Sequence, residues 1–234
     1  MRVLSVVHDP AVTGGGGIFE RIVIERGDHL DRWVVADGDA APADPARWDV
    51  LMVFGGAMHP DQDAEHPWLR SEVEFIERAL AEGVPTIGVC LGSQLIARAA
   101  GAWVGPAEQP EVGWFSVELN DEGTADPVLG VVPRRVEAFQ WHHYTFALPE
   151  GAVELASSAA AKQAYRLGER AWGIQFHAEV DRRMLDSWLR EGASELPKPI
   201  AQVRDDTDRH LRAWNAHGRA LCHAFLDEAG RLSA

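Results

Sequence analysis

The chain has 234 residues, of which 46% are hydrophobic and 25% charged, an ordinary composition for a globular protein with a buried core. Acidic residues outnumber basic ones by 36 to 22, so the formal net charge is -14. This charge repels nucleic acid and anionic membrane surfaces, and we expect neither as a partner. The two cysteines, Cys90 and Cys222, are too few for a disulfide framework. With no signal peptide and no apolar run of membrane-spanning length, the sequence predicts a cytoplasmic protein.

In the first half of the chain, short apolar runs alternate with amphipathic stretches, a pattern typical of a parallel sheet covered by helices. Strands are predicted at residues 3–7, 33–36, 50–54 and 86–89. A helix with apolar residues at three- and four-residue spacing begins at Pro67 and ends at Gly83. A shorter helix is predicted over residues 91–100 and is closed by Gly101.

The second half is different, because its strands follow one another with few helices between them. They are predicted at residues 114–119, 135–139, 153–156, 164–167 and 172–176. A parallel core followed by an antiparallel half favours one mixed sheet over two domains. We therefore predict a domain over residues 1–195 and a helical extension over 196–234 that packs on it.

One segment combines a cysteine with the glycines of a tight turn. In Gly88-Val89-Cys90-Leu91-Gly92, the thiol stands where a buried strand meets a helix. This is the nucleophile-elbow pattern, and its glycines let the turn pass close to its neighbours. The partial positive charge of a helix N-terminus favours the thiolate, and the N–H of Leu91 points to where an oxyanion forms. A cysteine alone is more often a small buried hydrophobe, but its glycines favour a nucleophile.

A cysteine nucleophile needs a base, and the segment Gly173-Ile174-Gln175-Phe176-His177-Ala178-Glu179 supplies one. We expect a strand that ends at His177, with Glu179 leaving the same face two residues later. The carboxylate then holds the imidazole in one tautomer. A lone His-x-Glu is a weak signal, but this one follows a buried strand at the edge where α/β proteins build their sites.

The two segments resemble the signature motifs of class I glutamine amidotransferases, in the right order. The match extends to the glycine turn Phe54-Gly55-Gly56-Ala57, to Glu111-Val112-Gly113-Trp114 and to Gln140-Trp141-His142. It is closest to stand-alone, GMP-synthase-like glutaminase domains. The resemblance implies a three-layer, doubly wound α/β fold with a mixed, mostly parallel, flavodoxin-like sheet. It also implies release of ammonia from the side-chain amide of glutamine through a cysteinyl γ-glutamyl thioester.

Site residues follow from the resemblance position by position. It implies Cys90 as nucleophile, His177 as base and Glu179 as the residue that orients the base. The N–H groups of Gly56 and Leu91 form the oxyanion hole. The substrate pocket is implied at Gly55, Gln94, Glu111, Gly113, Trp114, Trp141 and His142. The reaction requires no metal and no cofactor, and no Cys/His cluster has the spacing of metal ligands.

The sequence departs from the family pattern at two places, and three functions are open. Ala178 replaces the usual proline between the histidine and the glutamate, and His143-Tyr144 replaces a small residue and an acid. The first function is a glutaminase subunit that passes ammonia to a separate synthetase, because no ATP-binding motif is present. The second is a free-standing hydrolase of γ-glutamyl amides or peptides, which the missing acid favours. The third is a non-catalytic binding or regulatory relative, against which the intact Cys, His and Glu argue.

The remaining features of the sequence predict no specific binding or catalytic site. The run of residues 14–17 is all glycine but lacks the Gly-Lys-Ser/Thr of a phosphate loop, so a surface loop is expected. The polar stretch that holds His59, Asp61, Asp63 and His66 is expected to form a mobile rim of the active site rather than a metal site. Cys222 is expected to be inert.

Overall fold

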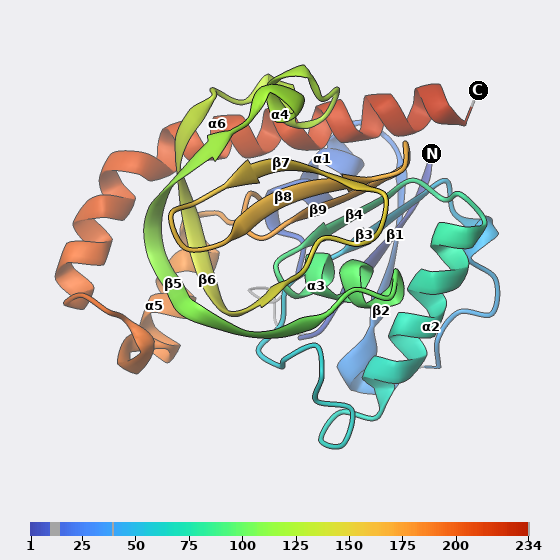
Figure 1. The fold of residues 1–234 in the computed structure, drawn as a ribbon, viewed down its shortest axis with the longest axis horizontal. Helices are drawn as coiled ribbons and strands as arrows, with labels where there is room; N and C mark the ends of the chain where they lie inside the picture. Colours follow the sequence, from blue (N-terminus) through green and yellow to red (C-terminus); the bar gives the residue numbers. More distant parts are fainter. Residues whose placement is uncertain (10–14, 39, 234) are drawn as a thin grey trace.

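The structure is a computed structural model that describes residues 1–9, 15–38 and 40–233. Within these residues one sheet has the strand order β2-β1-β3-β4-β9-β8-β7-β5-β6 (Figure 1). The parallel strands are β2 (His29–Val34), β1 (Arg2–Val7), β3 (Val50–Val53), β4 (Thr86–Val89) and β9 (Ala171–Ile174). Antiparallel pairing continues through β8 (Lys162–Leu167), β7 (Ala152–Ser157), β5 (Val104–Leu119) and β6 (Arg135–Phe146). The predicted mixed sheet, a parallel core with an antiparallel half, is confirmed.

Helices cover both faces of the parallel strands, as a three-layer fold requires. On β1, Val3 and Val7 belong to a core shared with α1 (Gly17–Glu25) and α6 (Ile200–Leu232). Leu4 and Val6 point to the other face and pack with α2 (Trp68–Ala81) and α3 (Leu91–Ala99). This alternation buries both faces of each central strand, and therefore these strands are mostly apolar. The shorter elements are α4 (Asp121–Ala125), α5 (Arg182–Glu191), η1 (Val35–Asp37), η2 (Pro45–Arg47), η3 (Leu129–Val131) and η4 (Ala193–Glu195).

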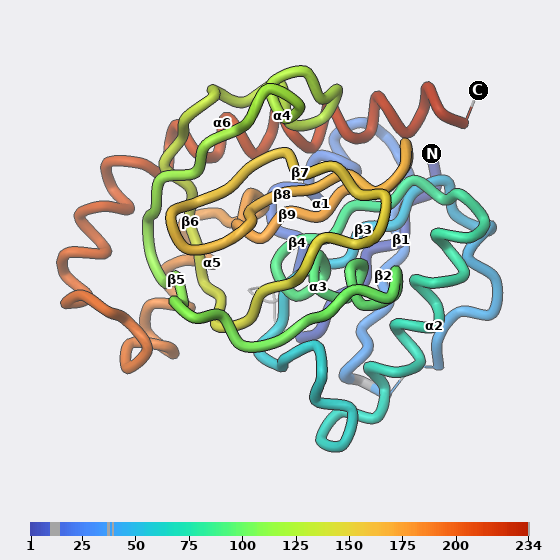
Figure 2. Tube along the Cα trace, in the orientation of Figure 1, coloured from blue at the N-terminus to red at the C-terminus, as the bar shows by residue number. Residues whose placement is uncertain are grey.

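The C-terminal helix α6 is an integral part of one face of the molecule. Figure 2 shows it running along the sheet and ending near the N-terminus. Its predicted apolar face is buried, with Leu211, Trp214, Leu221 and Phe225 all in the core. The division of the chain at residue 195 stays a prediction. None of the helices in the described part of the chain is long and apolar enough to cross a membrane.

Two expectations from the sequence are wrong at the N-terminal end. The second strand is His29–Val34, not 33–36, because β2 is a sheet edge whose polar residues face solvent and mask its start. The glycine run is not a surface loop: Gly15 and Gly16 are buried, and Gly17 begins α1. Gly14 lies outside the described residues. A Cβ on Gly16 would lie 2.4 Å from the Phe54 ring, so glycine is needed at this position because the backbone packs closely against its neighbours.

Candidate active site

Cys90 stands between β4 and α3, at the carboxyl end of the parallel strands. Its φ of 53° is the one positive value outside glycine in the described residues. Such a backbone conformation costs about 1–3 kcal/mol and persists only where the surroundings hold it. Both flanking glycines are required, because a Cβ on Gly88 would lie 2.5 Å from the backbone of Gly92, and one on Gly92 would lie 2.0 Å from the Val53 carbonyl oxygen. The tight turn predicted at Cys90 is therefore present.

The register of β4 and β9 brings the segment of His177 to Cys90. Val89 lies opposite Ile174, and the Cys90 N–H donates to the Ile174 carbonyl at 2.8 Å. The prediction that the strand runs to His177 is wrong, since β9 ends at Ile174. Beyond it the chain leaves β4 and bonds to the antiparallel half, where the His177 N–H donates to the Phe139 carbonyl at 2.9 Å.

His177 is buried between an acid and a thiol. Its Nδ1 lies 2.7 Å from Glu179 Oε1, and Cys90 lies close enough for its charge to act on the ring. The Trp188 ring meets it edge to face at 4.8 Å between centroids. Burial disfavours the imidazolium, but the charges of Glu179 and Cys90 outweigh burial and raise the pKa of His177 well above its usual value. The thiol also lies 3.6 Å from the Trp141 carbonyl oxygen.

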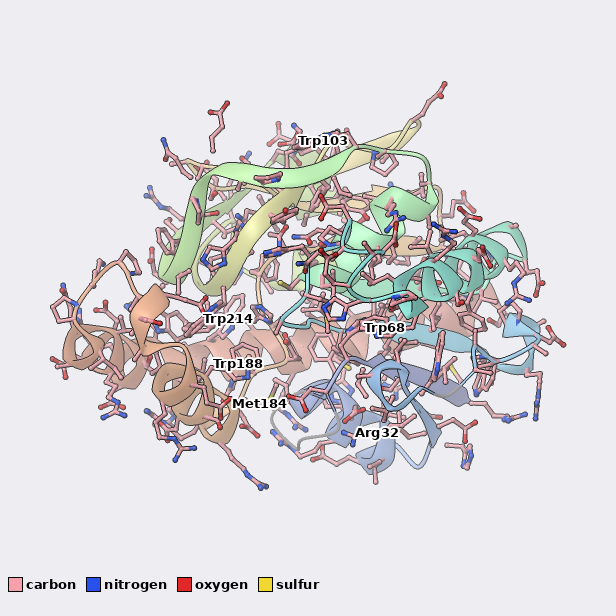
Figure 3. The ribbon with its side chains drawn as sticks, turned by 90° about the horizontal axis from the view of Figure 1, so that it is seen from below. Arg32, Trp68, Trp103, Met184, Trp188 and Trp214 are labelled. Atoms are coloured by element: carbon pink, nitrogen blue, oxygen red, sulfur yellow. The ribbon has the colours of Figure 1, made fainter. Side chains whose placement is uncertain are left out.

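The carbonyl groups around His177 are held by α1 and α6, which lie outside the sequence motifs. The indole N–H of Trp214 donates to the His177 carbonyl at 2.7 Å, and Asn215 Nδ2 donates to the Val180 carbonyl at 2.6 Å. From the start of α1, the Ile18 N–H donates to the Glu179 carbonyl at 2.8 Å. Figure 3 labels Trp188 of α5 and Trp214 of α6, the two indoles that contact His177. This segment therefore does not need a proline at position 178 to be rigid.

A cavity of about 290 Å³ opens above Cys90 and His177. Its floor comes from the ends of β3, β4 and β9, and one wall comes from α5 and the turn that follows it. Its lining comprises Asp9, Gly15, Gly55, Gly56, Ala57, Cys90, Trp141, His177, Glu179, Trp188, Glu191, Gly192 and Glu195. The predicted glycine turn and the predicted nucleophile and base therefore share one cavity, at the sheet edge where α/β folds place ligands.

The cavity lining is acidic, and sequence reasoning missed most of its acids. Besides Glu179 it holds Asp9, Glu191 and Glu195, and it contains no lysine or arginine among the described residues. Neighbours orient two of these carboxylates: Ser187 donates to Glu191 at 2.6 Å, and the Trp141 indole donates to Glu195 at 2.9 Å. For Asp9 a signal existed, because it follows β1 at the same sheet edge as Gly55 and Cys90. For the acids of α5 and the turn after it, the sequence held no such signal.

Several residues that the resemblance placed in the substrate pocket do not line this cavity. Gln94 is buried and donates to Gln175 and to the Tyr144 carbonyl. Glu111 and His142 bind each other, with Oε2 and Nε2 3.1 Å apart, in a buried cluster with Ser158 and Gln163. Trp114 is in the core, where its indole donates to Thr207, and Gly113 pairs with Gln140 between β5 and β6. Of this set, only Gly55 and Trp141 reach the cavity.

The polar stretch of residues 59–66 is tied to its surroundings. Asp63 forms an ion pair with Arg98, and the His59 ring stacks on Tyr144 at 3.9 Å between centroids. None of the four polar residues singled out there, His59, Asp61, Asp63 and His66, lines the cavity described above. Across the described chain, no group of three or more His, Cys, Asp or Glu side chains is placed to hold a metal ion. Cys222 is buried in α6, and burial raises the pKa of its thiol.

Comparison with known proteins places this geometry in a family. The profile of the family described as glutamine amidotransferase class-I matches residues 32–192. The glutamine amidotransferase-like protein YfeJ of Salmonella typhimurium is 29% identical over 97% of both chains. The γ-glutamyl-L-1-hydroxyisopropylamide hydrolase of a Pseudomonas species is 30% identical over 67% of this chain and 58% of that protein.

Among solved structures, a glutamine amidotransferase from Thermotoga maritima superposes with a TM-score of 0.85 at 28% identity. The match covers 96% of this chain and 97% of that one. The α/β fold predicted from the sequence is thus confirmed, together with the resemblance that implied it. The family profile and the fold agree with a cysteine elbow and an adjacent His-Glu pair at one sheet edge. The chain belongs to the class I glutamine amidotransferase family.

Proposed function

We propose that the chain hydrolyses the side-chain amide of glutamine with Cys90 as nucleophile, His177 as acid and base, and Glu179 as the residue that orients His177. One observation carries this proposal. The Cys90 thiol and a buried imidazole line one cavity, and the imidazole Nδ1 lies 2.7 Å from a carboxylate. A nucleophile beside a base that an acid orients is the arrangement that covalent acyl transfer needs.

The chemistry follows from these positions. The Cys90 thiolate attacks the carboxamide carbon, and the imidazolium of His177 protonates the leaving nitrogen as the C–N bond breaks. Ammonia departs, and the γ-glutamyl group remains on sulfur as a thioester. His177, now neutral, takes a proton from water as the water oxygen attacks the thioester carbon. The C–S bond breaks, glutamate leaves, and the proton held by His177 restores the thiolate–imidazolium pair.

The oxyanion of each tetrahedral intermediate needs preorganised donors. Leu91 begins α3, and the first N–H groups of a helix have no partner within it, so its amide is suited to this role. The Gly56 N–H belongs to the glycine turn, which lines the same cavity as Cys90. We assign the oxyanion hole to these two amides.

Replacement of the thiol tests the assignment. Cys90→Ala is expected to abolish glutamine hydrolysis and labelling by a glutamine-analogue electrophile. Cys222→Ala, which removes the buried thiol on α6, is the matched control and should keep both. Hydrolysis that persists in Cys90→Ala would show that the nucleophile is elsewhere.

A second candidate function has a specific observation in its favour. The cavity lining carries Asp9, Glu191 and Glu195 and no lysine or arginine among the described residues, a charge pattern that attracts an ammonium group. These carboxylates can bind the α-amino group of a γ-glutamyl substrate in place of the acid that His143-Tyr144 replaces. The named activity of the Pseudomonas relative, on a γ-glutamyl amide, points the same way. We therefore propose γ-glutamyl amides and peptides as alternative substrates.

One assay separates the candidates. Purified protein is offered glutamine and a panel of γ-glutamyl amides and peptides while ammonia, amine and glutamate are measured. Preference for the amides and peptides selects the free-standing hydrolase. Low glutaminase activity that rises with an added synthetase subunit selects a subunit that donates ammonia. No turnover and no thiol labelling under either condition selects a non-catalytic regulatory relative.

A further inference from the structure

A buried ionisable pair lies behind the glycine turn and takes no part in the chemistry described above. His8 follows β1, and Glu72 projects from α2. The His8 Nε2 atom is 3.0 Å from both carboxylate oxygens of Glu72, and both side chains are fully buried. The Trp68 ring, labelled in Figure 3, lies 5.7 Å from the imidazole between centroids. A buried polar pair is costly unless its hydrogen bonds are satisfied, so its partners are informative.

Both ring nitrogens of His8 face acceptors. Nδ1 lies 3.1 Å from the Gly55 carbonyl oxygen, which can only accept, so Nδ1 carries a proton. Nε2 faces a carboxylate and is protonated while Glu72 is ionised. Burial disfavours the imidazolium, but the charge and hydrogen bonds of Glu72 and the carbonyls of Gly55 and Phe54 outweigh it and raise the pKa of His8. His8 thus donates from one side of its ring to Glu72 and from the other to the glycine turn.

The carbonyl that His8 binds belongs to the peptide whose N–H is that of Gly56. The described chain contains no cis peptide bond, so this peptide is trans and planar, and its N–H points away from its carbonyl. With the carbonyl directed at His8, the N–H points the opposite way, and both glycines of this peptide line the cavity that holds Cys90. The turn is close to the reacting groups, since a Cβ on Gly55 would lie 3.1 Å from His177 Cε1.

We propose that His8 and Glu72 form a positioning pair that aims and polarises the Gly55–Gly56 peptide as an oxyanion donor. The inference rests on the function proposed above. A hydrogen bond accepted by a peptide carbonyl strengthens the donor at the other end of the same peptide, by about 10–30% in condensed-phase estimates. Packing adds to the constraint, because a Cβ on Gly56 would lie 2.8 Å from His8 Cβ. Glu72 anchors the ring, and the ring fixes the plane of the peptide.

The test distinguishes an effect on the oxyanion donor of the glycine turn from an effect on the reactivity of the Cys90 thiol. His8→Leu removes the donor, His8→Gln supplies a different one, and Glu72→Gln removes the anchoring charge. Ser5→Ala, which deletes a buried hydrogen bond from β1 to Glu20, is the matched control on the strand that precedes His8. Each variant is measured for kcat and KM, and for alkylation of Cys90 by iodoacetamide. That alkylation is a displacement at carbon that forms no oxyanion.

The expected result is a kcat at least tenfold lower in His8→Leu, with KM within twofold and the alkylation rate unchanged. His8→Gln should recover part of the lost kcat. The kcat of Glu72→Gln should fall several-fold, and Ser5→Ala should keep the wild-type kcat. A folded His8→Leu with wild-type kcat overturns the proposal, as does alkylation that slows in proportion to kcat. If His8→Leu does not fold, Glu72→Gln decides by the same criteria.

Failure of the proposed function has a different signature. Activity that survives in Cys90→Ala, or its absence from the wild type on every γ-glutamyl substrate, removes the function itself. Wild-type activity that depends on Cys90 but not on His8 or Glu72 removes only the positioning pair.

Discussion

The indole N–H of Trp214 donates to the carbonyl oxygen of His177 at 2.7 Å, so α6 holds the backbone of the proposed base. Trp214→Phe keeps most of the buried ring but removes this donor. We expect kcat to fall several-fold, because the imidazole loses its fixed position, and stability to fall by about 1 kcal/mol. Steady-state kinetics and urea unfolding measure the two effects.

Trp172→Phe is the matched control for that variant. Its indole also donates in the core, to Asp126 at 3.1 Å, but it lies away from the cavity. A similar loss of stability with unchanged kcat is expected. Equal kcat in wild type and Trp214→Phe would show that α6 stabilises the fold without positioning His177.

Gly218 gives a second test of the same helix. A Cβ at this position would lie 2.1 Å from the Ala178 carbonyl oxygen, a backbone atom that cannot move alone. Gly218→Ala therefore should push α6 away from the His177 segment, lower kcat and cost about 1–3 kcal/mol of stability. Gly230→Ala, on the same helix with only the Met1 sulfur at 4.0 Å, should be neutral or gain up to about 1 kcal/mol. Thermal unfolding and kcat of the two variants check the contrast.

The pH dependence of the reaction should report the charge of Glu179. Glu179 and Cys90 raise the pKa of His177 against the effect of burial, so Glu179→Gln lowers it. His177 then loses its proton at a lower pH, and the alkaline limb of kcat/KM should move to lower pH. The exposed Glu82, changed to Gln, should leave the limb in place. An alkaline limb that stays fixed in Glu179→Gln contradicts the assignment of Glu179.

Substrate recognition should depend on the acidic wall. Glu191→Gln and Glu195→Gln are expected to raise KM for γ-glutamyl substrates about tenfold with kcat little changed, because each removes a charge that attracts an ammonium group. Acetylation of the substrate α-amino group gives the matched comparison: it should raise KM in the wild type and have little further effect in the variants. If acetylation changes KM equally in all three proteins, these carboxylates do not bind the amine.

The sequence predicted the parallel half of the fold and the two segments that meet in the cavity. Cys90 and His177 were recoverable because each follows a buried apolar strand, and parallel strands end at one edge. Trp188 and Glu191 could not be recovered, since the periodicity of α5 does not indicate that the end of this helix lines the cavity beside Cys90. The resemblance assigned Glu111, Trp114 and His142 to the substrate pocket, yet their side chains bond to one another or pack in the core. Resemblance located the strands that surround the site but not the direction of each side chain.

The pairing of Val89 with Ile174 has a consequence for how this architecture can change. Cys90 and His177 follow β4 and β9, which are neighbours in the sheet, while β5 to β8 intervene along the chain. Turns such as those at Gly151 and Gly168 can lengthen or shorten without altering that register. Changes in the segments between β4 and β9 therefore leave Cys90 and His177 in place. New surfaces for partners can evolve in those segments while the reacting groups stay unchanged.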